Sequence, residues 1–332
     1  MHDSGLLPRR DSLSNPQESA PMVNKYLVKA VKEDSQLQES IFEFLNFTEL
    51  LIRASQGAAQ AQCLLQLLGC FSDQAAERFQ KKLGWIKGML NNTREDIREL
   101  VAQIYSIVAS ACPKDSFERA LTDLTKVFKD KQLEFQTGCI MAMGFSLGRY
   151  FMLEKIKNKG KDTLITVTCF KEITELILEQ LNHSHQLMLG SACLAIGEIG
   201  RCTKLPLEDS GKEDDITNKL AVVKTLLSLM KSGKSSMKVR ERAALAVGQL
   251  CIGDASFPHR DIVIKGFLEA IQEIKEVELH LTMGEALVYA VLGPLSPMGR
   301  DLWTIDEQEF KPVYDVEISD SYMAGVLEDL MG

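Results

Sequence analysis

Gly144-Phe145-Ser146-Leu147-Gly148 has the GxSxG spacing that presents a nucleophilic serine in many hydrolases. That motif needs a strand entering a tight turn and a helix leaving it, so that the serine hydroxyl stands exposed over a sheet. Here the flanking residues, CIMAM and RYFML, continue one helical apolar stripe, and the similar segment GEIG (197–200) has no serine. We therefore expect Ser146 to pack inside a helix. An α/β serine hydrolase centred on Ser146 is the enzymatic alternative.

Gly233-Lys234-Ser235 ends like a Walker phosphate-binding loop but lacks that loop's first glycine. The glycine belongs at position 228, which is Ser228, and the stretch before the motif, LAVVKTLLSLM, is an amphipathic helix instead of a buried strand. We expect a solvated turn between helices and no nucleotide site.

The histidines lack the neighbours of a metal site. His183 and His185 form an HxH pair in the turn QLNHSHQL, but no cysteine or carboxylate cluster at zinc-site spacing lies nearby. His259 and His280 are isolated. All four are expected to be structural residues of surface turns.

Glu198 and Glu285 each follow a glycine inside a helical pattern. A glutamate at this place would hydrogen-bond the adjoining loop or repeat, or act as an acid. No partner carboxylate shares its register, which favours the structural role. The sequence thus predicts no catalytic, cofactor-binding or metal-binding residues.

The segment KVRERAALAVGQLCIG (238–253) and its near-copies organise the chain. Its apolar residues fall at helical spacing, and we expect Arg240, Glu241 and Gln249 to face away from that stripe. The copies align at Tyr105, Gly144, Gly197, Gly248 and Ala290. Intervals of roughly 39 to 53 residues are those of two-helix HEAT or armadillo units with variable loops. The predicted fold is an all-α HEAT/armadillo solenoid.

Glycines recur inside these helical patterns, at Gly144, Gly197, Gly248 and Gly284. Each costs about 0.5–1 kcal/mol relative to alanine within a helix. Recurrence at three equivalent positions, Gly144, Gly197 and Gly248, predicts that neighbouring helices approach too closely there to admit a Cβ atom. The alternative is that they mark helix ends.

About six helical hairpins are expected, with no strand of any length. The first helical pattern begins near Lys25. It continues through a segment in which Ser35 and Gln38 have capping-box spacing. Two later helices are expected to start at Thr93 with Asp96 and at Asp115 with Glu118. The other predicted helix pairs are 73–90 with 93–111, 115–128 with 133–153, 161–181 with 185–201, 216–230 with 237–252, and 260–274 with 277–292.

Composition excludes several classes of protein. The 332 residues carry a net charge of −8, which argues against a nucleic-acid footprint. No apolar run is long enough to span a bilayer, and no secretory signal is visible. The eight cysteines show no CxxC pair and mostly occupy apolar stripes. We expect a reducing cytosolic or nuclear setting.

Four segments are predicted along the chain: a disordered tail over residues 1–23, the solenoid over 24–293, an irregular linker over 294–318, and the start of a further repeat over 319–332. The tail contains Arg9-Arg10-Asp11-Ser12, which resembles a basophilic kinase site. LPLEDSGKEDD (205–215) is expected to be a flexible acidic loop. Because no polar capping repeat follows, the sequence is interpreted as a fragment of a longer array.

An ordered set of motifs resembles one family. AIGEIG (195–200), GDASFPH (253–259), TMGEA (282–286) and GRDLW (299–303) are similar to one region of the large proteasome-associated adaptor and scaffold proteins, which are long HEAT-repeat chains. The resemblance is strongest over residues 160–303 and is not seen in the first 23 residues.

The resemblance implies a non-enzymatic adaptor. It would bind the 26S proteasome through regulatory- and core-particle subunits, help hold the two particles together, and link proteasomes to endomembranes and motor proteins. Location in cytoplasm and nucleus, with association to endoplasmic reticulum and endosomes, is implied in the same way. The alternative is another HEAT binding protein, such as a nuclear transport receptor or a phosphatase scaffold.

The repeat register predicts the cost of one substitution. If Leu245 is buried between repeats, Leu245→Ala lowers the free energy of unfolding by about 2–5 kcal/mol, measured by chemical denaturation. A loss below about 0.5 kcal/mol contradicts this register.

Overall fold

The computed structural model describes residues 29–30, 33–55, 57–70, 77–130, 132–158, 167–209 and 218–296. The predicted tail, its kinase-like site, most of the predicted linker and the further repeat lie outside these residues. The chain divides into two compact units, Met1–Phe117 and Glu118–Gly332. Each unit is described by itself.

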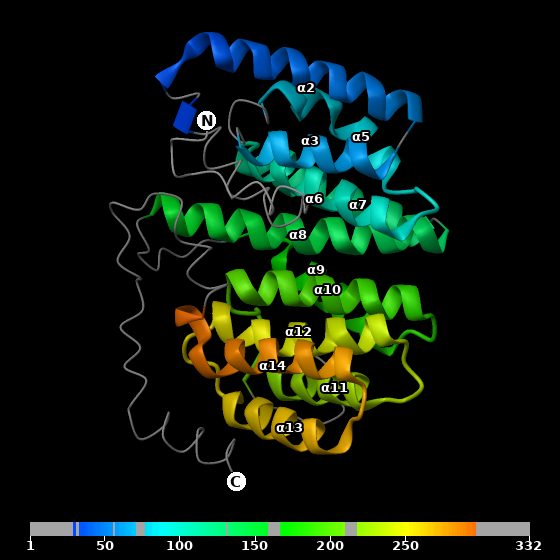
Figure 1. Ribbon diagram of the computed structural model, residues 1–332, viewed down its shortest axis with the longest axis vertical. Coiled ribbons are helices and arrows are strands. Elements are labelled where there is room, and N and C mark those ends of the chain that lie inside the picture. Colours follow the sequence, from blue (N-terminus) through cyan, green and yellow to red (C-terminus); the bar gives the residue numbers. More distant parts are fainter. Residues whose placement is uncertain are drawn as a thin grey trace. The chain divides into compact units, whose positions relative to one another are not determined.

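The first unit is built from helices that pack in pairs. They are α2 (Ser35–Ser55), α3 (Ala58–Cys70), η3 (Gln80–Lys82), α5 (Leu83–Met89) and α6 (Glu95–Ser110). Helix α3 contacts both α2 and α6, and α5 contacts α6 (Figure 1). The α5–α6 pair is the predicted 73–90/93–111 hairpin, and residues 73–76 of it are outside the description.

Both helix starts predicted in this unit are wrong by one or two residues. The Asp34 carboxylate, and not Ser35, accepts the hydrogen bond of the Gln36 amide at 2.9 Å and so caps α2. The α6 helix begins at Glu95 instead of at Thr93. Asn92 accepts from the Arg94 amide there, at 2.9 Å. Short polar side chains compete for the same free amides at a helix start, and the turn geometry decides which one reaches them.

The second unit repeats a short first helix followed by a longer second helix. Its elements are α7 (Lys114–Asp130), α8 (Leu133–Lys157), α9 (Phe170–Glu179), η4 (Gln180–Asn182), α10 (Gln186–Cys202), α11 (Lys219–Lys231), α12 (Met237–Gly253), α13 (Arg260–Glu273), α14 (Val277–Leu292) and η5 (Gly293–Leu295). These match the predicted hairpins. Helix α9 starts at Phe170 instead of near Lys161, and α7 starts one residue before the expected Asp115.

The second helices form the core of this unit. Helix α10 lies between α8 and α12, and α12 lies between α10 and α14, while α11 and α13 cover α12 and α14 (Figure 1). Within the described residues the sole extended pairing is an isolated bridge between Glu208 and Asn218. The predicted all-α solenoid of stacked helical hairpins is confirmed. No helix in the described ranges combines the length and hydropathy needed to cross a bilayer.

Close glycine contacts hold the second helices together. A Cβ atom added to Gly144 would lie 2.5 Å from the Ala195 Cα, and one added to Gly248 would lie 2.5 Å from the Ala286 carbonyl oxygen. One added to Gly197 would lie 3.1 Å from the Ala246 Cα. The predicted close approach is confirmed at these three glycines, which lie inside helices. No side chain fits in that space without moving a neighbouring backbone.

Gly284 lies outside these three equivalent positions, and a Cβ built on it meets no described atom within 4 Å. One detail of the predicted register is wrong. Gly144 faces Ala195, which lies two positions before Gly197 in the next second helix. In the same way, Gly197 faces Ala246, which lies two positions before Gly248. Because Gly248 faces Ala286, the equivalent residue in α14 is Val288 and not Ala290.

Arg240 and Gln249, expected to face away from the apolar stripe, are buried. The Arg240 guanidinium donates to the Met230 carbonyl at 3.0 Å and to the Glu276 carboxylate at 2.7 Å, so it joins the end of α11 to the start of α14. The hydrogen bond from Arg240 lowers the pKa of Glu276. A long side chain is buried at little cost when its charged end reaches such partners.

Leu245 is half-buried instead of fully buried. It packs at the edge of a cluster formed by Cys202, Ile252 and Tyr289. The cost of Leu245→Ala is therefore expected to fall below the range of about 2–5 kcal/mol for a fully buried leucine.

The glycine contacts are a sharper test of the stack. Gly248→Ala is expected to lower the free energy of unfolding by about 1–3 kcal/mol, because the new methyl group meets the backbone of α14. Gly84→Ala is the matched control, since a Cβ there meets nothing within 4 Å. It is expected to raise stability by up to about 1 kcal/mol through helix propensity. Urea unfolding followed by circular dichroism measures both. Equal effects of the two substitutions would contradict the close approach.

Candidate functional site

Ser146 lies in the middle of α8 and is fully buried. Its hydroxyl oxygen has no hydrogen-bond partner. The two glycines of the motif face α10, where Gly144 meets Ala195 and Gly148 meets the Glu198 carbonyl. A nucleophile elbow requires an exposed serine on a strand-to-helix turn. The hydrolase alternative is therefore wrong, and the pattern records helix packing.

The other candidate ligand motif is a turn, as predicted. Gly233 and Lys234 lie between α11 and α12, where the Ser235 amide donates to the Ser232 carbonyl at 3.2 Å. Ser236 then caps α12 by accepting from the Val239 amide.

The four histidines make local backbone contacts. His185 caps α10, where its Nδ1 accepts from the Leu187 amide at 3.3 Å. His183 Nδ1 accepts from the His185 amide at 3.0 Å. The rings of His259 and His280 contact the carbonyl groups of Asp209 and Ile274. In the part of the chain that the structure describes, no three His, Cys, Asp or Glu side chains are grouped as metal ligands would be.

Both intrahelical glutamates pair within their own helices. Glu198 forms an ion pair with Arg201 at 2.7 Å, and Glu285 accepts from the Tyr289 hydroxyl. The expected bond to an adjoining repeat is therefore not the one that forms. Residues three or four apart on a helix are neighbours, and these partners are the nearest available.

Three cysteines of the second unit, Cys169, Cys193 and Cys202, are poor nucleophiles. Burial raises the pKa of Cys169 to about 11 and that of Cys193 to about 12. Burial is also the main cause that raises the pKa of Cys202 to about 11. Because the thiolate is the reactive form, these thiols are inert near neutral pH. They act as small packing residues, as their positions in the apolar stripes predicted.

A buried lysine joins the loops at one end of the stack. The Lys219 ammonium contacts the Asp209 carboxylate at 2.8 Å and the Asp254 carboxylate at 3.1 Å. Lys204 contacts the other oxygen of Asp254 at 3.3 Å. The Lys219 amide also donates to the Glu208 carbonyl. The described start of the acidic loop expected to be flexible is thus held at Glu208 and Asp209, and residues 210–217 are outside the description.

The electrostatics of this cluster are structural. Burial by itself lowers the pKa of Lys219, but hydrogen bonds to Asp209 and Asp254 outweigh it and raise the pKa above its ordinary value. A nucleophilic lysine needs a lowered pKa, so that the neutral amine is available. Lys219 stays cationic and neutralises the carboxylates around it.

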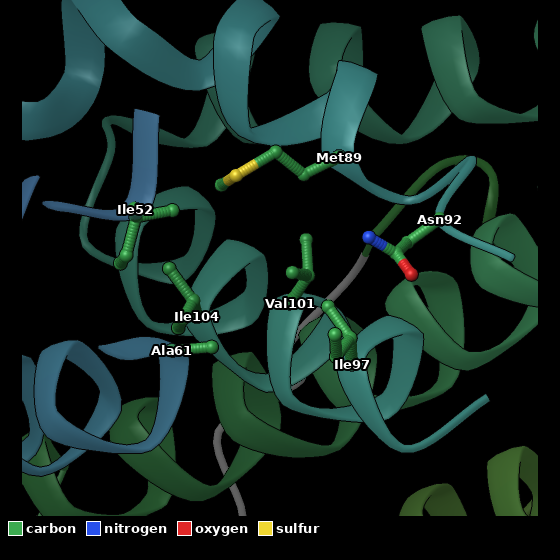
Figure 2. Close-up of a pocket in the computed structure, with 7 residues that line it drawn as sticks. All are labelled: Ile52, Ala61, Met89, Asn92, Ile97, Val101 and Ile104. Atoms are coloured by element: carbon green, nitrogen blue, oxygen red, sulfur yellow. The ribbon is translucent and has the colours of Figure 1, made fainter. Parts of the chain in front are cut away.

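Neither of two cavities lined by described residues has the form of a ligand pocket. One cavity of about 10 Å³ lies between α2, α3, α5 and α6, and Figure 2 shows its lining by Ile52, Ala61, Met89, Asn92, Ile97, Val101 and Ile104. It has room for about one water. An open groove of about 380 Å³ runs between α7 and α9, with Glu172, Glu175 and Glu179 along one side. Its polar groups are spread along a helix and do not converge on one point.

What remains is exposed apolar surface on two helices. On α2, Phe44, Phe47, Leu50 and Leu51 are between 39% and 64% exposed. On α14, Val277, Leu281 and Val288 are exposed. We call these sets the α2 patch and the α14 row. Large apolar side chains grouped on one face mark a surface that another element covers. The sequence analysis missed both. The signal for the α2 patch was the run FEFLNFTELLI (42–52), which carries more apolar residues than one buried face needs.

Comparison with known proteins places the chain in a family. A family model described as ECM29, ARM-like repeats matches residues 3–199, more than half of the chain. This chain belongs to the ECM29 family. The match begins inside the first 23 residues, where the motifs had shown no resemblance.

Two curated relatives of the ECM29 family extend the match. The human protein named proteasome adapter and scaffold protein ECM29 is 30% identical over 96% of this chain and 18% of its own length. The Drosophila melanogaster protein named proteasome-associated protein ECM29 homolog is 25% identical over 79% of this chain and 15% of its own length. The chain thus spans less than a fifth of either relative.

Solved structures similar to this ECM29-family chain include designed armadillo repeat proteins. One of them, in complex with a (KR)4 peptide, is 16% identical with a TM-score of 0.39, covering 80% of this chain and 98% of its own. Another is 15% identical with a TM-score of 0.38 over the same shares of the two chains.

The buried lysine gives a pH-dependent prediction. Lys219→Met is expected to lower the free energy of unfolding by about 3 kcal/mol near neutral pH. The reason is that the buried Asp254 carboxylate loses one of its two lysine partners and keeps only Lys204. The raised pKa of Lys219 stabilises the fold below its ordinary value of 10.5, and this is lost as the pH rises through the folded value. The lowered pKa of Asp209 stabilises the fold above its ordinary value of 3.8, and this is lost as the pH falls through the folded value.

The difference between wild type and Lys219→Met should therefore be flat between about pH 5 and pH 9 and shrink on either side. Urea titrations across this range measure it. Lys234→Met, in the exposed turn, is the control and should change stability by less than about 0.5 kcal/mol. A difference that did not vary at the acidic and alkaline ends would contradict the assignment.

Proposed function

We propose that this chain is a non-enzymatic scaffold segment that binds the proteasome. The observation that carries the proposal is the alignment of 96% of the chain with a human protein named as a proteasome adapter and scaffold. The relative in Drosophila melanogaster, named as proteasome-associated, supports the same partner.

The contacts of the candidate chemical groups support a binding role over turnover. Ser146 is buried inside a helix, Glu198 and Glu285 are paired within their own helices, and His185 caps one. Each of these side chains is packed, paired or capping within its own helix, and none of them faces another across a cleft. Catalysis needs groups that converge on one reacting atom.

Within this chain, the α2 patch is the surface that we assign to the proteasome. It lies inside the residues that the family model matches. Phe44 and Phe47 are the aromatic kind of residue that anchors protein interfaces. The opposite face of α2 is buried through Leu45 and Ile52, and Glu49 pairs there with Lys82. The helix is therefore held firmly while its apolar face is open to a partner.

We also propose a finer role, in which this chain is one part of a longer scaffold, as the 18% coverage of the human relative suggests. This chain supplies one contact, to a subunit of the regulatory or the core particle, and the remainder of a full-length scaffold supplies the second. Together the contacts hold the two particles and link them to endomembranes and motor proteins. The chain is then found with proteasomes in cytoplasm and nucleus, and at the endoplasmic reticulum and endosomes.

Capture of purified 26S proteasomes on the immobilised chain tests this proposal. The wild-type chain is expected to retain proteasomes. The double variant Phe47→Asp, Leu50→Asp is expected to bind at least about tenfold more weakly, because each aspartate places a charge in the apolar contact.

Ile262→Asp is the matched control, since Ile262 is an exposed apolar residue of α13, outside the α2 patch. It should leave capture unchanged, and circular dichroism checks that all variants fold. Equal loss in the control and the double variant would contradict the α2 assignment. Failure of the wild-type chain to capture proteasomes would overturn the proposed function for this segment.

A further inference from the structure

The outer face of α2 changes character at one point along the helix. Up to position 43 its exposed residues are polar or acidic, namely Gln36, Glu39, Ser40 and Glu43. From position 44 onward they are the α2 patch, all of whose members are apolar. The exposed face of α2 thus has an acidic half followed by an apolar half, and a partner that covers this helix contacts both.

The apolar half has the spacing of a helix that docks into a groove. Phe44, Phe47 and Leu51 stand at positions i, i+3 and i+7, which places them in one line along the helix. The rise of an α-helix makes this line about 10 Å long. All three side chains are between 39% and 53% exposed. An apolar groove of that length on a partner would receive them.

The stability of α2 does not explain the acidic half. Carboxylates favour a helix from its first turn, where they meet free backbone amides, but the first turn of α2 contains none. Glu39 and Glu43 lie beyond that turn and four residues apart, so their like charges weaken the helix. No lysine or arginine of α2 stands three or four residues from either glutamate. A cation on a partner would remove this repulsion.

We propose that the partner surface is an apolar groove bordered at one end by lysine or arginine side chains. This inference rests on the proposed function, and it describes the proteasome surface that receives α2. Phe44, Phe47 and Leu51 fill the groove, and the basic side chains lie beside Glu39 and Glu43. The two contacts fix the direction of α2, because a reversed helix would place carboxylates against the apolar walls.

The charges of α2 disfavour a second copy of this chain as the occupant. Each copy carries a net charge of −8, and such copies repel one another. Two parallel α2 helices would oppose Glu39 and Glu43 to the same residues of the partner copy. Two antiparallel helices would lay these carboxylates on phenylalanines. A basic protein surface satisfies both halves of the helix, because its charge is complementary.

Capture of purified 26S proteasomes on the immobilised chain, repeated over a range of KCl concentrations, tests the inference. The double variant Glu39→Gln, Glu43→Gln is expected to weaken capture roughly threefold at low salt. Glu39→Lys, Glu43→Lys is expected to weaken it at least about tenfold, because it opposes like charges. Wild-type affinity should fall as KCl rises from about 50 to about 400 mM, since salt screens these contacts, and the glutamine variant should lose less.

Glu179→Lys, Glu278→Lys is the matched control. Both residues are exposed and belong to the second unit, and the double variant changes the net charge of the chain by the same amount. It should leave capture within about twofold of wild type at physiological salt, where charges far from the contact are screened. Circular dichroism checks that every variant folds.

The outcomes separate this inference from the proposed function. Wild-type capture that neither glutamate variant weakens overturns the basic groove and leaves the proposed function in place. Equal loss in the control does the same, because the effect then belongs to net charge. A wild-type chain that captures no proteasomes at low salt overturns the proposed function, and this inference with it. A dimer in light scattering that is lost in Phe47→Asp assigns the α2 patch to a second copy and also overturns both.

Discussion

The contact of glycine with the backbone of the next helix sets the spacing of the second helices α8, α10, α12 and α14. Where Gly144, Gly197 and Gly248 meet their neighbours, a single added carbon would collide with backbone or Cβ atoms. Each glycine costs helix propensity, about 0.5–1 kcal/mol. The close packing between second helices outweighs that cost, because dispersion contacts are made along whole helices and fall off steeply with distance. The first helices and the loops are arranged around this spacing.

Close stacking also explains where the buried charges are. Once α10, α12 and α14 are this close, polar side chains near their ends are enclosed and need partners. Arg240 donates hydrogen bonds to the Met230 carbonyl and the Glu276 carboxylate, and Lys219 forms ion pairs with Asp209 and Asp254. These pairs join one repeat to the next. They keep the charged groups ionised and fixed, which suits a rigid binding surface and opposes the poised, mobile protons of general acid–base catalysis.

The α2 patch of the first unit and the α14 row of the second unit differ in composition. The α2 patch carries two phenylalanines on a helix whose other face is buried, as an interface for a large partner requires. The α14 row carries only aliphatic residues. The groove beside α9 and the cavity beside α6 each lack convergent polar groups. A segment of this kind acts through its outer faces, in keeping with the scaffold role proposed for it.

The sequence by itself determined the fold class, the order of the hairpins and the close approach at three glycines. Those features depend on local periodicity and on residue size, which can be read directly from the amino-acid sequence. It also predicted the helical packing of Ser146 and the turn at Gly233, whereas His280, expected in a surface turn, lies within α14. Only the tertiary structure decided that Arg240 and Gln249 are buried, that Leu245 is at an edge, and that Val288 holds the place expected of Ala290. The exposure of the α14 row was likewise beyond the sequence, whereas the apolar run over residues 42–52 carried a signal for the α2 patch. A helical pattern shows which residues share a face, but whether a neighbour covers that face depends on packing between segments far apart in the chain.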